Sequence, residues 1–325
     1  MKYASLLEIQ ALVQPQMQAT ETLMQKEMTS EVQLANLVMQ YALGNGGKRF
    51  RPLLTLLSAG LCNYAAGHEI TAAAFIEFIH NATLLHDDVV DESDMRRGQP
   101  TANIAFSNAA SVLVGDFLYT RAFQLMVRTH NTAVIETMAQ ATNLIAAGEV
   151  MQLSNMHDPD VDEARYYRVI ELKTAVLFSA ACKIAAQLAE QKAENIHALA
   201  EYGRRLGMAF QMMDDVLDYM GDAQIIGKSL GDDLAEGKPT MPLIRAQQQL
   251  SPPERARLRA IIEAGEREAI DEVIALLRKT DALEYSRIKA EEMAQSAGDC
   301  LNIFPDNDYK EALKAVAYFA AHRNA

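Results

Sequence analysis

Apolar residues recur at helical spacing along most of this chain. Leu, Val and Met at intervals of three and four predict amphipathic helices between residues 6 and 42, with a break at Thr29-Ser30-Glu31. Small and apolar side chains occupy nearly all sides of residues 70–90, which indicates a long buried helix. Similar patterns predict helices over 103–128, 132–155, 166–190 and 195–220, and several more over 240–325 with breaks at Ser251-Pro252-Pro253 and Phe304-Pro305. An all-α fold is therefore expected.

The composition is typical of a globular protein. Of the 325 residues, 50% are hydrophobic and 22% are charged, which is enough apolar material for a large core. The sequence contains no Pro-, Gly- or Ser-rich linker, no low-complexity tract and no clear internal repeat. We therefore expect one domain over residues 1–325, a single large helical bundle around a central cavity.

Net charge, cysteine content and hydropathy indicate which partners the protein binds, the redox state of its thiols and its location. The net charge of −13 disfavours nucleic acid and anionic membrane surfaces, so a polyanionic substrate needs local Lys and Arg side chains together with metal. Cys62, Cys182 and Cys300 lack metal-ligand spacing and an even number, which favours reduced thiols that are core or inert surface residues. No signal peptide and no run of about 18 apolar residues is present, so we expect a cytoplasmic protein without a transmembrane segment.

Two acidic clusters end otherwise apolar helical runs, each with the pattern Asp-Asp-x-x-Asp. The aspartates are Asp87, Asp88 and Asp91 in the first cluster, and Asp214, Asp215 and Asp218 in the second. Residues four apart on a helix lie about 40° apart around its axis, so the outer carboxylates of each cluster share one face and repel each other. Hard oxygen ligands of this kind suit Mg²⁺, which keeps several waters and often bridges to substrate phosphates.

A single cluster of this kind is more often a solvated helix end than a metal site. An EF-hand is excluded, because Val89 stands where a third-position ligand belongs and Glu92 where the loop requires Gly. Two copies, each at the end of a long apolar helix, favour a functional interpretation. We expect both clusters to face one cavity.

Basic residues precede and follow the first cluster in the sequence. Three glycines in residues 44–47 precede Lys48, Arg49 and Arg51, which is typical either of a loop that holds diphosphate or of a solvated basic turn. His80 lies on nearly the same helix face as Asp87, two turns away, and is either a ligand contact or a hydrogen-bonded core histidine. Arg96 and Arg97 follow the aspartates, where a loop can fold cations back over bound phosphate.

Polar residues also interrupt two later apolar helices. Lys173 requires a partner anion if it is buried, although a surface position is equally compatible with the pattern, and Thr174 can bend its helix and free carbonyl groups. Gln211 lies near Asp214 on the second acidic helix. The Gly-rich polar segment that follows, residues 221–237, contains Lys228 and is a candidate lid, with Lys238 just beyond it.

Five motifs in this order resemble those of the trans-polyprenyl diphosphate synthases, most closely the bacterial long-chain, octaprenyl type. They are GGKRFRP at 46–52, LLHDDVVDESDMRRG at 84–98, KTA at 173–175, FQMMDDVLDY at 210–219 and GKSLGDDLAEGKPT at 227–240. The resemblance extends over essentially the whole chain. It implies an all-α, isoprenoid synthase-like homodimer whose central cavity holds the product. The implied reaction condenses isopentenyl diphosphate head to tail with an allylic diphosphate, for which farnesyl diphosphate is expected, in repeated steps.

The resemblance also implies a role for each motif. The six aspartates, Asp87, Asp88, Asp91, Asp214, Asp215 and Asp218, belong to motifs that hold about three Mg²⁺ ions on the allylic diphosphate. The side chains implied to contact that diphosphate are Arg96, Lys173, Lys228 and Lys238. Those implied to hold isopentenyl diphosphate are Lys48, Arg51, His80 and Arg97. Gln211 and the carbonyl groups of Lys173 and Thr174 would stabilise the allylic cation as neutral dipoles, and the departing diphosphate would remove the proton.

Product length is a separate inference. In this family, bulky aromatic residues four and five positions before the first aspartate shorten the product, and here those positions hold Thr83 and Ala82, which are small. We therefore expect a long chain for quinone side chains, with octaprenyl favoured over nonaprenyl and over the shorter geranylgeranyl product. Ile79, Met126 and Met138 are further candidates to line or close the cavity.

Two other interpretations compete with this one. A class I terpene cyclase also uses Asp-rich helices and Mg²⁺, but it has no need of a second-substrate site such as the GGKRFRP loop and His80. A non-catalytic subunit of a heteromeric synthase would have decayed motifs, whereas all six aspartates and the expected cations are present.

Overall fold

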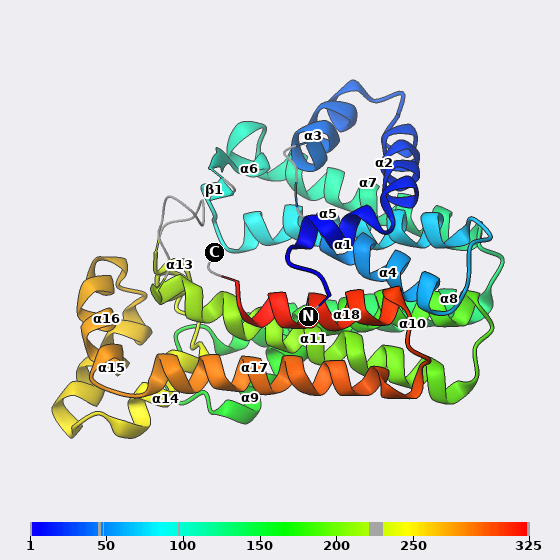
Figure 1. Cartoon of the computed structure of the whole chain (residues 1–325). Coiled ribbons are helices and arrows are strands. Elements are labelled where there is room, and N and C mark those ends of the chain that lie inside the picture. The colour runs from blue at the N-terminus through cyan, green and yellow to red at the C-terminus, as the bar shows by residue number, and fades with distance from the viewer. Residues whose placement is uncertain (1, 45–46, 48, 97, 221–229, 324–325) are drawn as a thin grey trace. The chain divides into compact units, whose positions relative to one another are not determined.

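The computed structural model describes residues 2–44, 47, 49–96, 98–220 and 230–323. These residues are helical except for connecting loops and one short antiparallel hairpin of β1 (Met95–Arg96) and β2 (Gln99–Pro100), which confirms the all-α prediction (Figure 1). The N-terminal helices are α1 (Leu6–Ala11), α2 (Gln14–Glu27), α3 (Gln33–Gly44), α4 (Phe50–Leu61), α5 (His68–Val90), α6 (Ala102–Ala105), α7 (Asn108–Val127) and α8 (Thr132–Asn155). The remaining elements are α9 (Glu163–Ile170), the π-helical turn η1 (Glu171–Ala175), α10 (Val176–Leu188), α11 (Ala193–Met220), α13 (Asp232–Ala235), α14 (Met241–Gln249), α15 (Pro252–Ala264), η2 (Arg267–Ala269), α16 (Ile270–Arg278), α17 (Ala282–Cys300), η3 (Leu301–Ile303) and α18 (Asp308–Ala321).

Most predicted helices match observed elements closely, and the largest difference lies in residues 166–190. The single helix expected there is three elements, α9, η1 and α10, joined without a loop. The predicted break at residue 251 is the start of α15, where Ser251 and Glu254 form a reciprocal capping box and Pro252 occupies the first turn.

The described chain divides into two compact units. The first unit comprises Met1–Thr142, Leu177–Gly203 and Gly298–Val316, and the second comprises Asn143–Val176, Arg204–Ala297 and Ala317–Ala325. Five of the described helices, α8, α10, α11, α17 and α18, begin in one unit and end in the other. The expected single domain stays a prediction.

In the first unit, α5 packs along α7. Residues 72–74 of α5 are alanines that are fully buried, which lets neighbouring helices approach closely. At Gly115 of α7, an added Cβ would stand 2.3 Å from His86 Nε2, so a larger residue would displace the His86 ring of α5. The Ser111 hydroxyl donates to the Leu85 carbonyl oxygen at 2.8 Å. The last turns of α5, which hold the first aspartates, are therefore fixed by α7.

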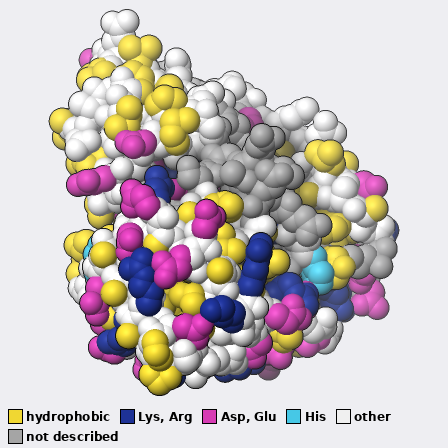
Figure 2. Space-filling model, turned by 90° about the vertical axis from the view of Figure 1, so that its left-hand side faces the viewer, with side chains coloured by type: hydrophobic (Ala, Val, Ile, Leu, Met, Phe, Trp, Pro, Cys, Tyr) yellow, Lys and Arg dark blue, Asp and Glu magenta, His cyan; other side chains and the backbone are white. Residues whose placement is uncertain are grey.

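In the second unit, the C-terminal half of α11 has one face in an apolar cluster. Met208, Met212 and Val216 pack there with Tyr166 of α9 and Met241 of α14. A second cluster joins α13, α14, α15 and α16. On the outside of these helices Figure 2 shows positive and negative side chains intermixed, and Arg257, for example, forms ion pairs with Glu266 and Glu272. The acidic residues of α11 thus lie on a helix whose other face is anchored in the core.

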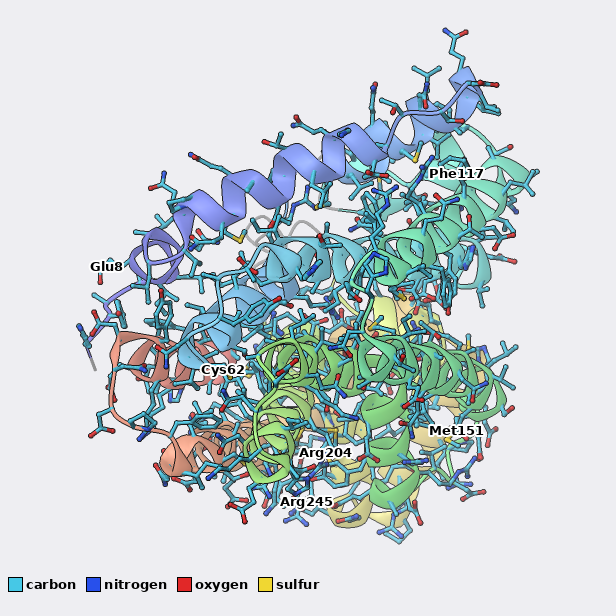
Figure 3. The ribbon with its side chains drawn as sticks, turned by 90° about the vertical axis from the view of Figure 1, so that its right-hand side faces the viewer. Glu8, Cys62, Phe117, Met151, Arg204 and Arg245 are labelled. Atoms are coloured by element: carbon cyan, nitrogen blue, oxygen red, sulfur yellow. The ribbon has the colours of Figure 1, made fainter. Side chains whose placement is uncertain are left out.

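The cysteines and the helix hydropathy agree with the sequence interpretation. Cys62, which follows the last residue of α4 (Figure 3), and Cys182 are buried, Cys300 is partly exposed, and none of these three described cysteines forms a disulfide. Burial raises the pKa of the Cys62 and Cys182 thiols to about 12, so both remain protonated and unreactive near neutral pH. Within the described ranges, no helix combines the length and the apolar character needed to span a bilayer.

Candidate active site

The first aspartate motif lies at the C-terminal end of α5. Asp87 and Asp88 are in the last turn, and Asp91 caps the helix by donating its backbone N–H to the Asp87 carbonyl oxygen at 2.8 Å. Asp88 is buried, whereas Asp87 and Asp91 are partly exposed. The negative end of the helix dipole makes this a costly place for three carboxylates. The motif therefore requires positive charge from the protein, a metal ion or both.

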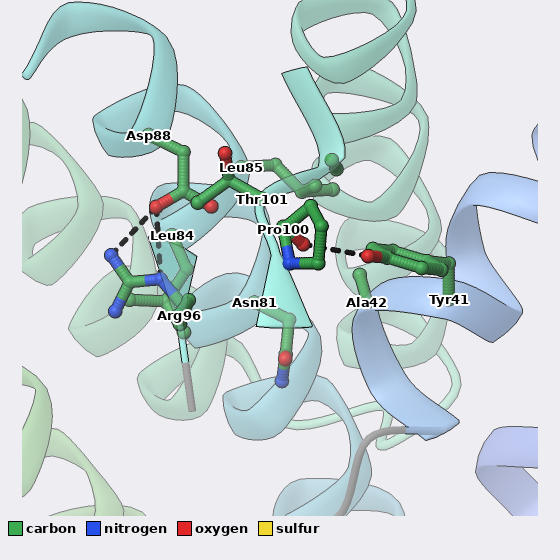
Figure 4. A pocket seen from close by; sticks show the side chains of 10 residues that line it. Tyr41, Ala42, Asn81, Leu84, Leu85, Asp88, Arg96, Pro100 and Thr101 are labelled. Carbon is green, nitrogen blue, oxygen red and sulfur yellow. Dashed lines mark hydrogen bonds and ion pairs between the residues drawn. The ribbon is translucent and has the colours of Figure 1, made fainter. Parts of the chain in front are cut away.

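Arg96 supplies positive charge to the buried member of this motif. The β1–β2 hairpin turns at Gly98, whose φ of +75° favours glycine, and returns Arg96 to α5. Arg96 Nε and Nη2 lie 2.8 and 2.7 Å from Asp88 Oδ1 (Figure 4). Burial raises the pKa of the Asp88 carboxyl, although Arg96 opposes the shift. The hairpin brings Arg96 back to α5, where its partner is Asp88, and the predicted contact with a phosphate stays a prediction.

The pocket in Figure 4 adjoins this ion pair within the first unit. Asn81, Leu84 and Leu85 of α5 form one wall, and the hairpin forms another. The Tyr41 hydroxyl of α3 donates to the Pro100 carbonyl oxygen at 2.6 Å, which ties the hairpin to α3. The position of Arg96 thus depends on α3 as well as on α5.

The basic loop before α4 contains one cation that the protein itself neutralises. Arg49 adopts the left-handed conformation with φ +43° and lies 2.7 Å from Glu21 Oε1 and 2.9 Å from Glu77 Oε1. It also donates to the Leu43 carbonyl oxygen at 2.8 Å. The neighbouring Lys48 lies outside the described residues. Arg49 therefore joins α2, α3 and α5 at this loop.

Arg51 lies in the first turn of α4, and its environment differs from that of Arg49. Its guanidinium carbon lies 4.6 Å from the centre of the Phe178 ring, and its buried Nε has no hydrogen-bond partner among the described residues. Burial lowers the pKa of Arg51 to about 10, although Glu77 opposes the shift. A partly exposed cation with a buried, unused donor is suited to bind an anion.

Further predicted residues lie on α5, α7 and α8. His80 and Thr83 are partly exposed, and the Thr83 hydroxyl donates to the His80 carbonyl oxygen at 2.8 Å. The other residues predicted to set product length are fully buried: Ile79, Ala82, Met126 and Met138. Burial is compatible with a cavity lining and with ordinary core packing, so their role stays a prediction.

The second motif, on α11, contains a buried carboxylate held by neutral donors. Asp215 accepts hydrogen bonds from the Tyr166 hydroxyl at 2.6 Å and from Gln211 Nε2 at 2.8 Å. The Thr174 hydroxyl in turn donates to Gln211 Oε1 at 2.9 Å. Burial and the nearby Asp233 raise the pKa of Asp215 well above its ordinary value, while Tyr166 and Gln211 oppose the shift. The predicted residues Thr174 and Gln211 are thus in direct contact.

Lys173 and Thr174 lie in the π-helical turn η1. A distortion was expected here from Thr174 bonding to the preceding turn, but its hydroxyl is directed to Gln211, and the distortion is the π-turn itself. Lys173 Nζ lies 2.6 Å from Glu149 Oε2 of α8. On the same helix, an added Cβ at Gly148 would stand 2.8 Å from the Lys173 backbone N. Glycine at this position therefore lets α8 approach η1.

The outer aspartates of the second motif have their own contacts. Asp218 Oδ2 accepts from the Asp233 backbone N–H at 3.2 Å. Asp214 Oδ1 lies 3.1 Å from Arg323 Nη2, and the Arg323 guanidinium carbon lies 3.9 Å from the centre of the Phe210 ring. Arg323 is near the end of the sequence and outside every motif, so no sequence signal indicated it. Tyr166 was missed for the same reason.

Of the remaining predicted cations, only Lys238 is among the residues that the structure describes. Lys238 forms an ion pair with Glu236. Arg97 and Lys228 are outside the described residues, as is most of the candidate lid, which falls in 221–229. The predictions for these positions stay open.

The carboxylates fit a metal that is only partly enclosed by protein. No three His, Cys, Asp or Glu side chains form a ready metal cage in the described part of the chain. Each motif instead presents two partly exposed carboxylates one helical turn apart, Asp87 with Asp91 and Asp214 with Asp218. Mg²⁺ commonly binds to one or two carboxylates and completes its octahedron with water and substrate phosphate. This donor set therefore suits Mg²⁺ brought together with a diphosphate.

Comparison with known proteins identifies the class. The polyprenyl synthetase family matches residues 32–279. The chain is 49% identical to an octaprenyl diphosphate synthase of Haemophilus influenzae, over 98% of each sequence, and 47% identical to that of Escherichia coli, over 98% of this chain and 99% of the relative. A crystal structure of a Caulobacter crescentus polyprenyl synthase, complexed with calcium and isoprenyl diphosphate, superposes with a TM-score of 0.96 at 40% identity and full coverage of both chains. A decaprenyl diphosphate synthase of Rhodobacter capsulatus gives 0.93, also at 40% identity, over 99% of this chain and 100% of that one.

This chain belongs to the polyprenyl synthetase family. It is a trans-prenyltransferase, as the five motifs predicted.

Proposed function

We propose that this enzyme makes all-trans octaprenyl diphosphate by adding isopentenyl diphosphate, head to tail and repeatedly, to an allylic primer such as farnesyl diphosphate. The observation that carries the proposal is near-complete alignment with two octaprenyl diphosphate synthases at 47–49% identity. The small side chains of Ala82 and Thr83 before the first aspartate are consistent with a long product. A nonaprenyl product is the nearest alternative.

The proposal assigns the two aspartate motifs to about three Mg²⁺ ions, which supply positive charge to the diphosphate as it departs. In the first motif the outer carboxylates are Asp87 and Asp91, and in the second they are Asp214 and Asp218. Each pair is partly exposed, as a site that exchanges metal and substrate requires. The buried Asp88 and Asp215 complete the motifs.

We assign the cations to two diphosphates. Those for the allylic diphosphate are Arg96, Lys173, Lys228 and Lys238. Those for isopentenyl diphosphate, with the histidine, are Lys48, Arg51, His80 and Arg97. The unused buried donor of Arg51 supports its assignment, because a bound phosphate oxygen would satisfy it.

In the reaction, the bond between C1 and oxygen of the allylic diphosphate breaks, and positive charge develops on the allyl group. The double bond of isopentenyl diphosphate then attacks C1, and a proton passes from its C2 to the released diphosphate. Gln211 and the carbonyl groups of Lys173 and Thr174 stabilise the cation as neutral dipoles, which avoids a nucleophile that would trap it. The π-turn η1 supports this role, because its altered hydrogen bonding changes the direction of these carbonyls.

We further propose that the enzyme works as a homodimer in the cytoplasm. Large aliphatic side chains on α7 are exposed in the single chain, including Leu113 at 67% and Val127 at 58%. Exposed apolar side chains on a long helix favour coverage by protein, and a second copy is the partner that the family resemblance implies. Light scattering should give twice the chain mass of 35.9 kDa, and a monomer at micromolar concentration would refute the dimer.

The test is chain elongation by the purified protein with Mg²⁺, farnesyl diphosphate and radiolabelled isopentenyl diphosphate. We expect a polyprenyl diphosphate whose dephosphorylated alcohol has the octaprenyl mass, and no activity after chelation of divalent metal. A dominant geranylgeranyl product would refute the long chain. Cyclic hydrocarbon made without isopentenyl diphosphate would instead indicate a cyclase, and failure to consume isopentenyl diphosphate would indicate a non-catalytic subunit.

A matched pair of variants links the assay to the site. Asp214→Asn removes an outer carboxylate of the second motif, and we expect kcat to fall by about two orders of magnitude or more. Asp160→Asn removes an exposed carboxylate that is paired with Arg259 in the same unit, and we expect it to leave kcat unchanged. Equal activity of the two variants would contradict the assignment of Asp214.

A further inference from the structure

Three hydrogen bonds connect a tyrosine outside all five motifs to the residues proposed to stabilise the allylic cation. The Tyr166 hydroxyl donates to Asp215 Oδ2 at 2.6 Å, and Gln211 Nε2 donates to Asp215 Oδ1 at 2.8 Å. The Thr174 hydroxyl donates to Gln211 Oε1 at 2.9 Å. The four side chains come from α9, η1 and α11, all within the second unit. The connection therefore depends on tertiary packing and not on neighbours in sequence.

These bonds fix which way the Gln211 amide points. Its NH₂ end faces the Asp215 carboxylate, which only accepts hydrogen bonds, and its oxygen faces the Thr174 hydroxyl. A flipped amide would place two oxygens against each other at Asp215. The orientation matters for the reaction, because an amide oxygen stabilises a nearby cation and an NH₂ group opposes it.

The Tyr166 hydroxyl holds one oxygen of the Asp215 carboxylate, and the Gln211 amide holds the other. Tyr166 and Asp215 are buried, at 4% and 3% exposure, so water does not replace a lost donor easily. Without the phenol, Asp215 Oδ2 loses this hydrogen-bond donor, while the negative charge of Asp233 lies nearby. The carboxylate is then free to rotate about its Cβ–Cγ bond and to draw the Gln211 amide towards itself. That movement weakens the contact with Thr174.

The ring and the hydroxyl of Tyr166 have separable tasks. The ring packs in the apolar cluster with Ile170, Met212 and Met213. Phenylalanine retains that packing and removes only the hydrogen bond. The effect of the hydroxyl can therefore be measured without opening a large cavity.

We propose that Tyr166 is a positioning residue for the condensation: through Asp215 it keeps the Gln211 amide oriented towards Thr174. The inference rests on the proposed function, since it requires Gln211 and Thr174 to act on the allylic cation. In this role Tyr166 does not contact the substrate. Its loss should therefore affect the chemical step more than substrate binding.

The experiment compares Tyr166→Phe with Tyr202→Phe. Tyr202 is fully buried in the first unit, and its hydroxyl donates to the Leu313 carbonyl oxygen at 2.7 Å, so the control removes one buried hydroxyl that is outside the connection. We expect Tyr166→Phe to lower kcat of the first condensation about tenfold with both KM values within about twofold of wild type. Tyr202→Phe should keep kcat within about twofold while the two variants lose comparable thermal stability.

A double variant tests whether Tyr166 acts through Gln211. Once Gln211 is replaced by alanine, the further change Tyr166→Phe should lower kcat by less than about twofold, because the orientation that Tyr166 maintains no longer exists. Full additivity of the two changes would overturn the inference. So would a wild-type kcat for Tyr166→Phe, or an equal loss of kcat in Tyr202→Phe. A wild-type chain that forms no prenyl product would overturn the proposed function and this inference with it. An active wild-type chain with any of the three results above would overturn the inference alone.

Discussion

Replacing Glu77 with glutamine removes a negative charge beside Arg49 and preserves the size of the side chain. Glu77 is 6% exposed and Arg49 is 12% exposed, and their charged atoms lie 2.9 Å apart. Glu77 Oε1 also accepts from Asn81 Nδ2 at 3.3 Å. The second acidic partner of Arg49, Glu21, is 39% exposed. Arg49 therefore forms two ion pairs, one with a buried carboxylate and one with an exposed carboxylate.

The difference in burial sets the expected magnitudes. Removing one partner of a buried ion pair typically costs about 3–5 kcal/mol, because the other charge remains buried. Arg49 retains Glu21 and the Leu43 carbonyl oxygen, so we expect Glu77→Gln to cost less, about 2–3 kcal/mol. Glu21→Gln removes a solvent-screened partner and should cost less than about 1 kcal/mol.

Urea unfolding followed by circular dichroism measures the stability of both variants, and initial rates measure catalysis. Arg49 lies between Lys48 and Arg51, so its displacement should raise KM for isopentenyl diphosphate and leave KM for the allylic diphosphate nearly unchanged. Equal destabilisation by the two variants would refute the burial argument. A stability loss in Glu77→Gln with unchanged KM would show that Arg49 supports the fold without positioning the loop.

Two further predictions concern the product and the π-turn. Ala82→Tyr places a ring one turn before the aspartates and should shorten the product, and an unchanged mass of the dephosphorylated alcohols would refute a cavity at this position. Gly148→Ala places a Cβ 2.8 Å from the Lys173 backbone N and should lower both the melting temperature and kcat. Its control, Gly298→Ala, meets only Lys314 Cγ at 3.8 Å and should change neither, so equal behaviour of the two glycine variants would contradict the close-packing argument.

The helices and the aspartate motifs were accessible from sequence because they are local. Apolar periodicity defined α5 almost to the residue, and the spacing of the aspartates placed them at helix ends. The π-turn η1 was not recognised as such, because one extra residue in a helical turn hardly changes a short apolar pattern. Its position was nevertheless indicated by the polar pair Lys173 and Thr174 within an apolar helix.

The partners of the motif residues were not accessible, because they are distant in sequence. Tyr166 and Asp215 are 49 positions apart, and Arg323 and Asp214 are 109 apart. No local pattern connects such pairs. Likewise, Arg49 and Arg51 look equivalent in sequence, yet the left-handed backbone at Arg49 directs it to carboxylates, whereas Arg51 lies against the Phe178 ring.

The two aspartate motifs also differ in a way that their common pattern conceals. The middle aspartate of each is about 100° around the helix from the first, which turns it towards the protein while the outer pair stays partly exposed. In the first motif the buried Asp88 meets a cation, Arg96, so its charge is compensated within the chain. In the second, the buried Asp215 meets the neutral donors Tyr166 and Gln211, so its negative charge is solvated but not cancelled. The arginine that contacts the second motif, Arg323, pairs with the outer Asp214 and not with the buried Asp215, and a metal ion bound with diphosphate would supply further positive charge there.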